Sequence, residues 1–331
     1  MLLHTSKRED IFRISSAEEF NDAALDIFQY QYANNSIYKQ YADLIETDIS
    51  SIKNYREIPF LPIELFKTKE IKSFETEPEV VFQSSGTTGM QRSRHYVADL
   101  ALYEESFLKG FEYFYGVAKD YCFIALLPSY IERHDSSLVY MVNRLIETSR
   151  HSESSFYSNE YDKVAEVLKG LSEKGIKTIL IGVSFALLDL ADIFKGSLNE
   201  NIIIMETGGM KGRRKEMLRE ELHSILCNAF KVDSIQSEYG MTELLSQAYS
   251  KGNGLFKCPP WMKVMIRDTN DPFSVLGNEK TGGVNIIDLA NIYSCSFIAT
   301  QDLGRLHDDE SFEIVGRFDN SDIRGCNLLI D

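Results

Sequence analysis

The chain has 331 residues, of which 44% are hydrophobic and 26% are charged, as in an ordinary globular protein with room for a large core. Its formal net charge of -15 argues against a nucleic-acid-binding protein, because a phosphate backbone requires a basic surface. The sequence has no long apolar run and its N-terminus lacks an apolar signal segment, so we expect a cytoplasmic protein without integral membrane association.

The N-terminal region shows a helical pattern. Residues 16–19 read S-x-x-E, a capping-box pattern that predicts a helix start, and apolar residues then recur at helical spacing. A second helix is expected around 36–46. We therefore assign residues 1–78 to a helical N-terminal region.

Apolar runs alternate with amphipathic segments between residues 79 and 231. The expected strands cover 79–83, 121–127, 176–183 and 201–205. The expected helices cover 99–115, 137–148, 160–173, 184–195 and 212–229. This alternation predicts an α/β core with a mostly parallel sheet covered by helices.

The pattern changes after residue 232 to short strands separated by Gly, Asn and Asp turns. These strands are expected at 262–267, 283–288 and 311–316, and their short connections favour antiparallel pairing. The sequence contains no internal repeat and no linker of low complexity. We therefore expect a single α/β domain over residues 1–331, with a C-terminal β region at 232–331.

The first motif that carries chemistry is QSSGTTG, directly after the apolar run at 80–82. Backbone N–H groups and hydroxyls at the end of a strand can converge on phosphate oxygens, although an ordinary solvated turn has the same composition. The motif lacks the spacing of a Walker A loop. The candidate phosphate ligands are Ser84, Ser85, Gly86, Thr87, Thr88 and Gly89.

The second motif is SEYGMTE at 237–243. It offers an aromatic ring at Tyr239, a small residue at Gly240, a hydroxyl at Thr242 and a carboxylate at Glu243. These groups could stack on a base, contact a phosphate and bind Mg²⁺, which requires only one or two carboxylates when substrate phosphates complete its ligands. The alternative is a loop that caps a helix.

Two further motifs lie near the C-terminus. Asp302 follows an apolar strand and precedes Gly304-Arg305, so its carboxylate could accept hydrogen bonds from both hydroxyls of a ribose; an Asp-initiated turn is the alternative. The last motif is GRFD, which contains Arg317 and Asp319.

The order of these four motifs resembles the adenylate-forming superfamily of acyl-CoA synthetases and adenylation domains, over roughly residues 60–331. The resemblance implies ATP and Mg²⁺ as cofactors, a mobile phosphate loop at 84–89, and a ribose-binding role for Asp302. It also implies that Tyr239 and Thr242 contact adenine and the α-phosphate, and that Glu243 binds the metal. The Gly-Arg-x-Asp segment corresponds to a hinge, and Gly208 and Gly209 to an adenine-side turn.

Two departures from the superfamily pattern concern positive charge. The phosphate loop commonly ends in Pro-Lys, whereas this chain has Gln91-Arg92, so Arg92 or Arg94 would have to replace the lysine. The superfamily also has a small C-terminal domain with a catalytic lysine, whereas this chain ends 14 residues after Arg317 and has no lysine beyond Lys280. We therefore expect the small C-terminal domain to be absent.

The segments IPFLPIELFK and ETGGMKGRRKE, with a cysteine five residues from the end, resemble the LuxE-type acyl-protein synthetases of bacterial luminescence operons. In that family an activated fatty acyl group is carried on a cysteine near the C-terminus, a role that falls here on Cys326. A thiolate attacks an acyl adenylate readily, and the neighbouring Arg324 would lower the pKa of the thiol. A buried structural cysteine is the alternative.

The expected function is therefore ATP-dependent activation of a carboxylic, typically fatty, acid and its transfer to a thiol. The acceptor would be Cys326 and then a reductase partner, a carrier protein or coenzyme A. Two rivals remain open, a ligase without a covalent enzyme intermediate and a catalytically silent nucleotide- or acyl-binding protein. His134 and the basic residues at 211–215 could face the substrates or solvent, and the other four cysteines are expected in the core.

Overall fold

The computed structural model describes residues 10–85, 91–128, 133, 135–208, 214 and 217–318. Within these residues a twelve-stranded sheet runs through the molecule in the order β11-β12-β13-β14-β10-β9-β8-β7-β6-β4-β5, and β1 pairs with β13 outside this path. A separate two-stranded sheet contains β2 and β3. No helix in this part of the chain has the length and hydrophobicity needed to cross a bilayer.

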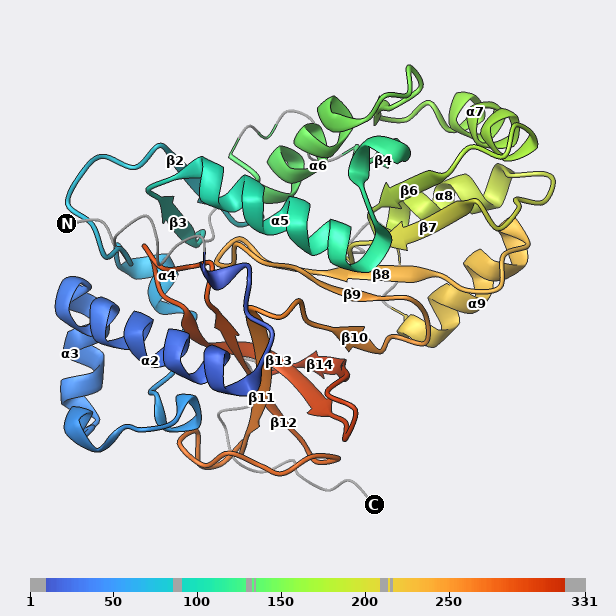
Figure 1. Cartoon of the computed structure of the whole chain (residues 1–331). Helices are drawn as coiled ribbons and strands as arrows, with labels where there is room; N and C mark the ends of the chain where they lie inside the picture. Colours follow the sequence, from blue (N-terminus) through green and yellow to red (C-terminus); the bar gives the residue numbers. More distant parts are fainter. Residues whose placement is uncertain are drawn as a thin grey trace.

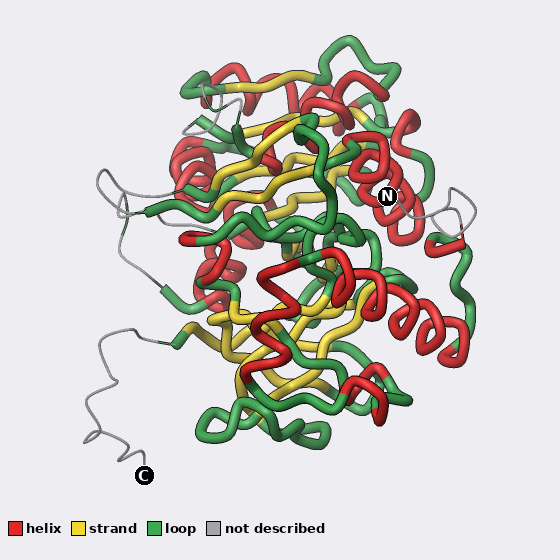
Figure 2. The backbone as a smooth tube through the Cα atoms, turned by 90° about the vertical axis from the view of Figure 1, so that its left-hand side faces the viewer, coloured by secondary structure: helices red, strands yellow, loops and turns green. Residues whose placement is uncertain are grey.

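One half of the large sheet is parallel and buried between helices. Its strands are β5 (Ser155–Tyr157), β4 (Cys122–Leu126), β6 (Thr178–Gly182), β7 (Ile202–Glu206) and β8 (Gln236–Tyr239). The runs CFIAL and TILIG are buried at every position, as expected for strands covered on both faces. Figures 1 and 2 show helices around these strands: α6 (Ser137–Thr148), α7 (Tyr161–Glu173), α8 (Ser184–Ile193) and α9 (Arg219–Phe230).

The sheet changes from parallel to antiparallel at β8. This strand is parallel to β7 and antiparallel to β9 (Ala248–Ser250). Along the main path of the sheet, the strands beyond β9 are antiparallel to one another: β10 (Phe256–Lys257), β14 (Phe312–Arg317), β13 (Phe297–Leu306), β12 (Thr281–Asp288) and β11 (Met262–Arg267). Ligand clefts in open α/β sheets lie beyond the carboxyl ends of the strands, where the connectivity switches, which directs attention to the residues after Tyr239.

The N-terminal helices cover the antiparallel half. Helices α2 (Ala17–Asn34) and α3 (Ser36–Leu44) place the rings of Phe28 and Tyr38 at 6.3 and 6.2 Å from that of Phe297 in β13. The chain then passes through β1 (Leu61–Pro62), which is parallel to β13, and α4 (Leu65–Thr68). Short 3-10 helices occupy Ile49–Ser51, Tyr55–Glu57 and Ala118–Asp120.

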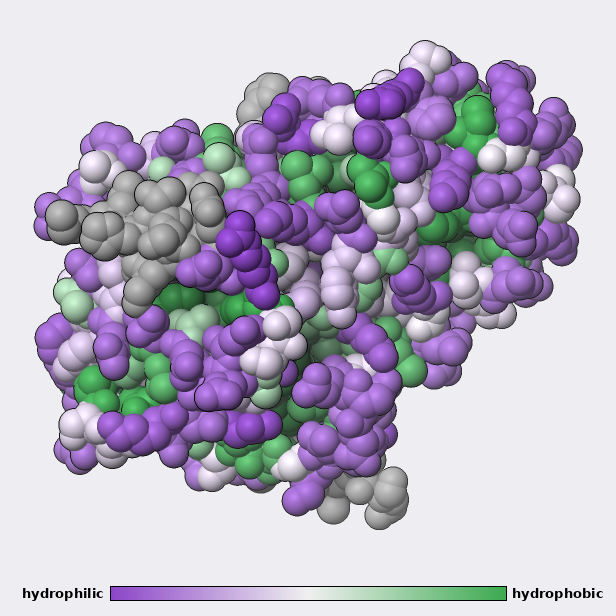
Figure 3. Space-filling model, in the orientation of Figure 1, coloured by the Kyte–Doolittle hydropathy of each residue, from purple (hydrophilic) through white to green (hydrophobic). Residues whose placement is uncertain are grey.

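Helix α5 (Leu100–Tyr115) lies along β8 and β9 (Figure 1). The Tyr115 hydroxyl donates a hydrogen bond to Oε1 of Gln236 in β8 at 2.9 Å, and the ring of Phe114 lies 5.2 Å from that of Tyr249 in β9. On the face shown in Figure 3, hydrophobic residues form small patches separated by hydrophilic ones.

The expected fold class, a mostly parallel helix-covered sheet with antiparallel C-terminal strands, is confirmed. The expected helix start at residues 16–19 is also present, because the Ser16 hydroxyl accepts a hydrogen bond from the Glu19 N–H at 3.1 Å. The Glu19 carboxylate, however, accepts hydrogen bonds from the N–H and hydroxyl of Ser15, whereas a capping box would have it accept from the N–H of Ser16.

Three expectations about elements were wrong. Strand β2 (Val80–Gln83) pairs with β3 (Arg94–Val97) in its own antiparallel hairpin and does not join the parallel sheet, since a short apolar run does not specify its partner. Helix α9 begins at Arg219, not near 212. Asp302 lies inside β13 and not at a strand end, because alternating burial continues the strand to Leu306.

Some strands were not anticipated at all. They include β5, β9 and β10, which are short, and β8, whose sequence QSEY is polar. The cysteines also differ from expectation, because Cys122 and Cys295 are buried whereas Cys227 and Cys258 are only half-buried.

Candidate active site

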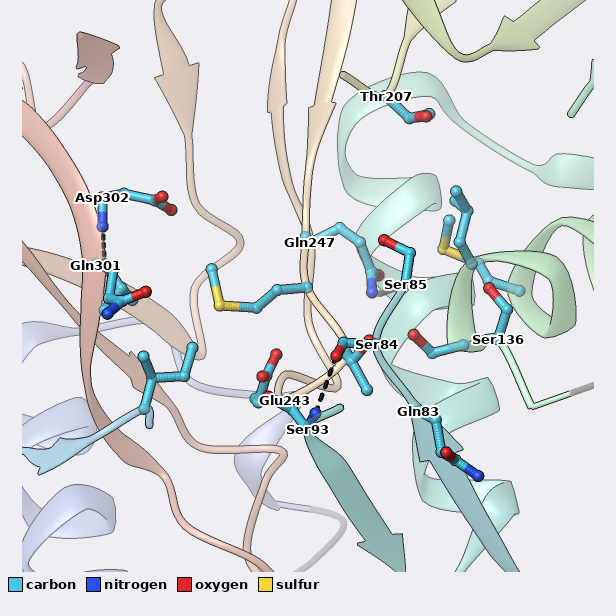
Figure 4. A pocket seen from close by; sticks show the side chains of 18 of the residues that line it. Gln83, Ser84, Ser85, Ser93, Ser136, Thr207, Glu243, Gln247, Gln301 and Asp302 are labelled. Carbon is cyan, nitrogen blue, oxygen red and sulfur yellow. Dashed lines mark hydrogen bonds between the residues drawn. The ribbon is translucent and has the colours of Figure 1, made fainter. Parts of the chain in front are cut away.

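A cleft of about 530 Å³ opens beyond the carboxyl end of β8 (Figure 4). Side chains from β2, from the segment after β8 and from β13 line it, although they are far apart in sequence. Seven of the predicted site residues are among them: Ser84, Ser85, Gly240, Thr242, Glu243, Asp302 and Arg317. A second groove of similar volume, at Tyr113, Phe114 and Cys258, contains none of the predicted residues that the structure describes.

The base of the predicted phosphate loop is closed by two serines. The N–H of Ser93 donates to the hydroxyl of Ser84 at 2.9 Å (Figure 4), and the N–H of Ser84 donates to the carbonyl of Ser93 at 3.1 Å. The guanidinium of Arg133 donates to the carbonyl of Gln83 at 2.9 Å and lines the cleft. The two ends of the loop are thus fixed next to a positive charge.

The segment after β8 is held by a buried histidine. Nδ1 of His95, on β3, lies 2.7 Å from the carbonyl oxygen of Thr242, and its Nε2 lies 3.0 Å from Oδ1 of Asn291. The Asn291 amide in turn donates to the carbonyl of Glu243 at 2.8 Å. Burial lowers the pKa of His95 to about 4, so the ring is neutral at physiological pH. Because both facing oxygens are acceptors, its single N–H donates to one of them. These bonds connect the phosphate-loop hairpin to Thr242 and Glu243.

A buried carboxylate fixes the residues that follow. Asp288 is fully buried, and its carboxylate accepts hydrogen bonds from the N–H groups of Leu245 and Ser246 at 2.8 and 2.9 Å. The Ser246 hydroxyl also accepts a bond from the indole of Trp261 at 3.0 Å. The segment that presents Glu243 is therefore anchored on both sides.

Glu243 is the best candidate for a metal ligand. Its side chain lines the cleft yet the residue is only 5% exposed, and burial raises its pKa while the Ser93 hydroxyl and the charges of Arg317 and Lys67 oppose this shift. A carboxylate that is costly to ionise is stabilised by a cation placed against it. The part of the chain that the structure describes contains no group of three or more His, Cys, Asp or Glu arranged for a metal, so substrate phosphates would have to complete the ligand set.

Asp302 lies where β13 passes the cleft, and both its carboxylate oxygens have partners. The Tyr239 hydroxyl donates to Oδ2 at 2.7 Å, and Nε of Arg317 lies 3.0 Å from Oδ1. Burial and the Asp302 charge raise the pKa of Tyr239, which keeps its hydroxyl a donor. The Arg317 side chain is 70% exposed, so this pair is easily exchanged with a ligand.

The predicted adenine-side turn follows β7, as expected. Gly208 has a φ of +74°, a left-handed conformation that favours glycine, and its N–H donates to the Glu206 carboxylate at 2.6 Å. Neither Gly208 nor Tyr239 lines the cleft directly, whereas Thr207 does. Its buried hydroxyl has no hydrogen-bond partner among the described residues, so it is available to a ligand.

Gly240 lies against the side chain of Glu238. A Cβ atom at this position would meet the Glu238 carboxylate, so a larger residue would require that side chain to move. The predicted small residue therefore leaves space for an acidic side chain that also lines the cleft.

Two predicted arginines are not brought into the cleft. Arg92, expected to replace a phosphate-binding lysine, is exposed and does not line it; its guanidinium lies 3.8 Å from Asp135. Arg94 stacks on Tyr96 instead. Several predicted positions lie outside the described residues: Gly86, Thr87, Thr88, Gly89, His134, Gly209, Asp319 and Cys326.

Sequence reasoning missed several residues at the cleft. His95 and Asn291 hold Thr242 and Glu243 from distant positions, and no spacing pattern connects them. Lys67 brings a positive charge from α4 to the cleft, and the IELFK segment that contains it was noted only for its resemblance. Glu238 belongs to the SEYGMTE motif but was given no role, and Gln247 follows that motif by four residues, so their position in the sequence was the one available signal.

Comparison with known proteins agrees with this geometry. The family model described as acyl-protein synthetase, LuxE, matches residues 10–331. The comparison with curated protein sequences gave no significant match.

Solved structures give a similar result for the fold. The chain is similar to ATP-bound MatB from Rhodopseudomonas palustris, with a TM-score of 0.54 and 15% identity over 73% of this chain and 49% of that chain. It spans about half the length of the MatB structures that it matches. It is also similar to 2-hydroxyisobutyryl-CoA ligase in complex with 2-HIB-AMP and CoA, with a TM-score of 0.63 and 14% identity over 97% of this chain and 73% of that chain.

At these identities the structural likeness establishes the fold and not the substrate. The family match, in contrast, covers nearly the whole chain and includes every residue of the cleft. This chain therefore belongs to the LuxE acyl-protein synthetase family and has the fold of the adenylate-forming enzymes.

Proposed function

We propose that the protein uses ATP to activate a carboxylic acid as an acyl adenylate and then transfers the acyl group to a thiol. One observation carries this proposal: the cleft gathers Ser84, Glu243 and Asp302 from three distant segments, and these are the residues for which we propose phosphate, metal and ribose contacts. The family match and the ATP-bound neighbour with the same fold support it.

In the first step, a carboxylate oxygen of the acid attacks the α-phosphorus of ATP. A new acyl–oxygen–phosphorus linkage forms, the bond from the α-phosphorus to the bridging oxygen breaks, and pyrophosphate leaves with the electron pair. Lys67, Arg133 and Arg317 all line the cleft and would stabilise negative charge that develops on the phosphates. The Ser84 hydroxyl, held by Ser93, would position an oxygen of the triphosphate.

The residues present fit a Mg²⁺ ion that accompanies ATP. Glu243 would hold it, and the phosphate oxygens would supply further ligands. Mg²⁺ would supply charge neutralisation of the departing pyrophosphate. The hydrogen bonds of Asn291 and His95 to the Glu243 and Thr242 backbone keep the carboxylate directed at this position.

The ribose would bind at Asp302. An ionised carboxylate can accept about four hydrogen bonds, so the ribose hydroxyls can bind while the Tyr239 hydroxyl remains in place. The exposed Arg317 would leave Asp302 or turn toward the phosphates, as expected for a hinge residue.

In the second step, a thiolate attacks the acyl carbon, a thioester forms and AMP leaves. We propose Cys326 as the first acceptor, with a reductase, a carrier protein or coenzyme A receiving the group afterwards. The resemblance to LuxE proteins suggests a fatty acid as substrate. The side chains that line the cleft determine which kinds of acid can bind in it.

Acyl labelling tests the transfer step. Wild-type protein incubated with ATP, Mg²⁺ and a radiolabelled acid substrate should retain label after denaturation and release it with neutral hydroxylamine. The Cys326→Ser variant should still exchange pyrophosphate into ATP but retain no label, and Cys227→Ser, a half-buried cysteine away from the cleft, is the matched control. An active wild type that never becomes labelled would favour direct transfer to an external thiol. A protein that binds ATP without any exchange would be a silent binder.

A further inference from the structure

The two ends of the cleft present different groups. Figure 4 shows Asp302 and Gln301 on one side, and Gln247, Ser85 and Ser136 on the other. The second side lies against α5 and the start of α6, because Tyr103 and Met141 also line it. If Asp302 binds the ribose, the side away from it is available to the acid.

Two polar side chains at this acid-facing end have no partner. Gln247 is 6% exposed, and its Oε1 atom is buried without a hydrogen bond to any described residue. Glu238 lines the same cleft, and among the described residues no hydrogen bond or ion pair engages its carboxyl group. Its neighbour on the same strand face, Gln236, is in contrast bonded to Tyr115 at 2.9 Å.

An alkyl chain would leave both groups unpaired. A buried acceptor such as the Gln247 oxygen that loses water without gaining a donor is unfavourable, and an alkyl chain would also remove water from the half-buried carboxyl group of Glu238. A site that binds a long unbranched chain is normally lined by apolar side chains, with polar groups confined to the reacting end. Gln247 and Glu238 do not fit that description.

We propose, on the basis of the adenylating function proposed above, that the acid carries a hydroxyl or amino group on a short chain and that this group donates hydrogen bonds to Gln247 and Glu238. A hydroxyl group has one hydrogen to share between the two side chains, whereas an ammonium group can serve both and would also favour the ionised form of Glu238. Selection then follows from the site itself, since an analogue without the donor leaves the buried Gln247 oxygen and the half-buried Glu238 carboxyl group unpaired.

The electrostatics of Glu238 agree with this assignment. Burial and the negative charge of Glu206 raise the pKa of Glu238 to about 8. Glu206 is itself close to a cationic group, with Nε of Arg219 at 3.5 Å, whereas Glu238 is not. A donor from the substrate would relieve the unfavourable burial of this carboxyl group.

Pyrophosphate exchange with matched acids tests the proposal. Butanoate, 3-hydroxybutanoate and 3-aminobutanoate have the same chain length and differ only in the donor, and tetradecanoate represents a fatty acid. We expect kcat/KM for the hydroxy or the amino acid to exceed that for butanoate and tetradecanoate at least tenfold. If 3-hydroxybutanoate is the better substrate, the donor is a neutral hydroxyl group; if 3-aminobutanoate is better, the donor is a cationic ammonium group. Both outcomes support the proposal.

Substitutions connect the preference to the two side chains. Glu238→Leu and Gln247→Leu should each reduce the preference for the donor-bearing acid at least tenfold through KM, with the Kd for ATP unchanged. Gln236→Leu, on the same strand face but bonded to Tyr115, should leave the preference intact. Fatty or alkyl acids that react equally well or better, with a preference insensitive to both variants, would overturn the inference and leave adenylation standing. Absence of exchange with every acid would instead overturn the proposed function, and the inference with it.

Discussion

The two ends of the cleft differ in how far their polar groups are already paired. At the nucleotide end, Asp302 is bonded to Tyr239 and Arg317, and the Thr242–Glu243 backbone is bonded to His95 and Asn291. At the acid-facing end, Gln247 and Glu238 have no partners within the described part of the chain. A nucleotide would therefore bind to side chains that protein hydrogen bonds already hold in place. The acid, in contrast, would supply the hydrogen-bond partners that Gln247 and Glu238 lack.

Replacing Glu243 should have the largest effect, because it removes the proposed metal ligand from the preorganised end. Loss of one group that stabilises developing charge typically costs about 10²–10³ in kcat. Glu243→Gln should therefore reduce pyrophosphate exchange roughly 10²-fold. Since the pKa of Glu243 is raised by burial, the neutral glutamine should not destabilise the fold near neutral pH, which thermal unfolding can check.

Glu313→Gln, in an ion pair with Arg305 outside the cleft, is the control for loss of a negative charge. Full exchange activity in the Glu243→Gln variant would show that this carboxylate is not the metal ligand.

Replacing Asp302 should have an intermediate effect that is confined to the nucleotide. Asp302→Ala removes an acceptor of two hydroxyl hydrogen bonds, each worth about 1.5–3 kcal/mol when the acceptor is charged. ATP affinity measured by calorimetry should fall at least tenfold, and discrimination against dATP should largely disappear. Asp309→Ala, at an exposed turn, is the control. Unchanged ATP affinity would exclude Asp302 from ribose binding, and a changed preference among acids would contradict the separation of the two ends.

Replacing His95 should have the smallest effect on catalysis, and it should also change the pH dependence of stability. His95→Leu removes the polar contacts of the ring with Thr242 and Asn291, of which the neutral ring can donate one as a hydrogen bond, so kcat should fall several-fold while the Kd for ATP stays within about twofold. His95→Gln, which can keep one bond, should recover part of the loss. A loss of ATP affinity equal to the loss of kcat would argue against a positioning role.

The pH dependence of unfolding adds a second measure of His95. Its folded pKa, about 4, lies below the ordinary value of 6.5, so its neutral form is favoured by folding. The stabilisation is complete above about pH 6.5 and is lost as the pH falls toward 4. The His95→Gln variant should lack this component, whereas a control variant of the partly exposed His151 should retain it.

The parallel half of the fold was predictable because burial on both faces requires continuous apolar runs. Strands β4, β6 and β7 consist of such runs and lie where they were expected. Strand β8 was missed because QSEY has no apolar alternation, and it is a strand through its pairing with β7 and β9. Strand β2 was assigned to the wrong sheet because a local pattern does not identify a partner.

The site was predictable as far as it is local in sequence. Ser84, Glu243 and Asp302 each belong to a short motif, and the order of the motifs indicated that they meet. His95 contacts a residue 147 positions away, and the pairing of Asn291 with the Glu243 carbonyl spans 48 positions, so neither could be derived from spacing. The unpaired state of Gln247 and Glu238 is a property of the packed cleft and has no counterpart in a motif.

Acid-dependent exchange of radiolabelled pyrophosphate into ATP, with wild-type protein and Mg²⁺, tests adenylation most directly because it does not depend on the acceptor thiol. The account predicts label in ATP only when a suitable acid is present, and loss of that label in the Glu243→Gln variant. A wild-type protein that binds ATP with measurable affinity but exchanges no pyrophosphate with any acid, short or long, polar or alkyl, would contradict it.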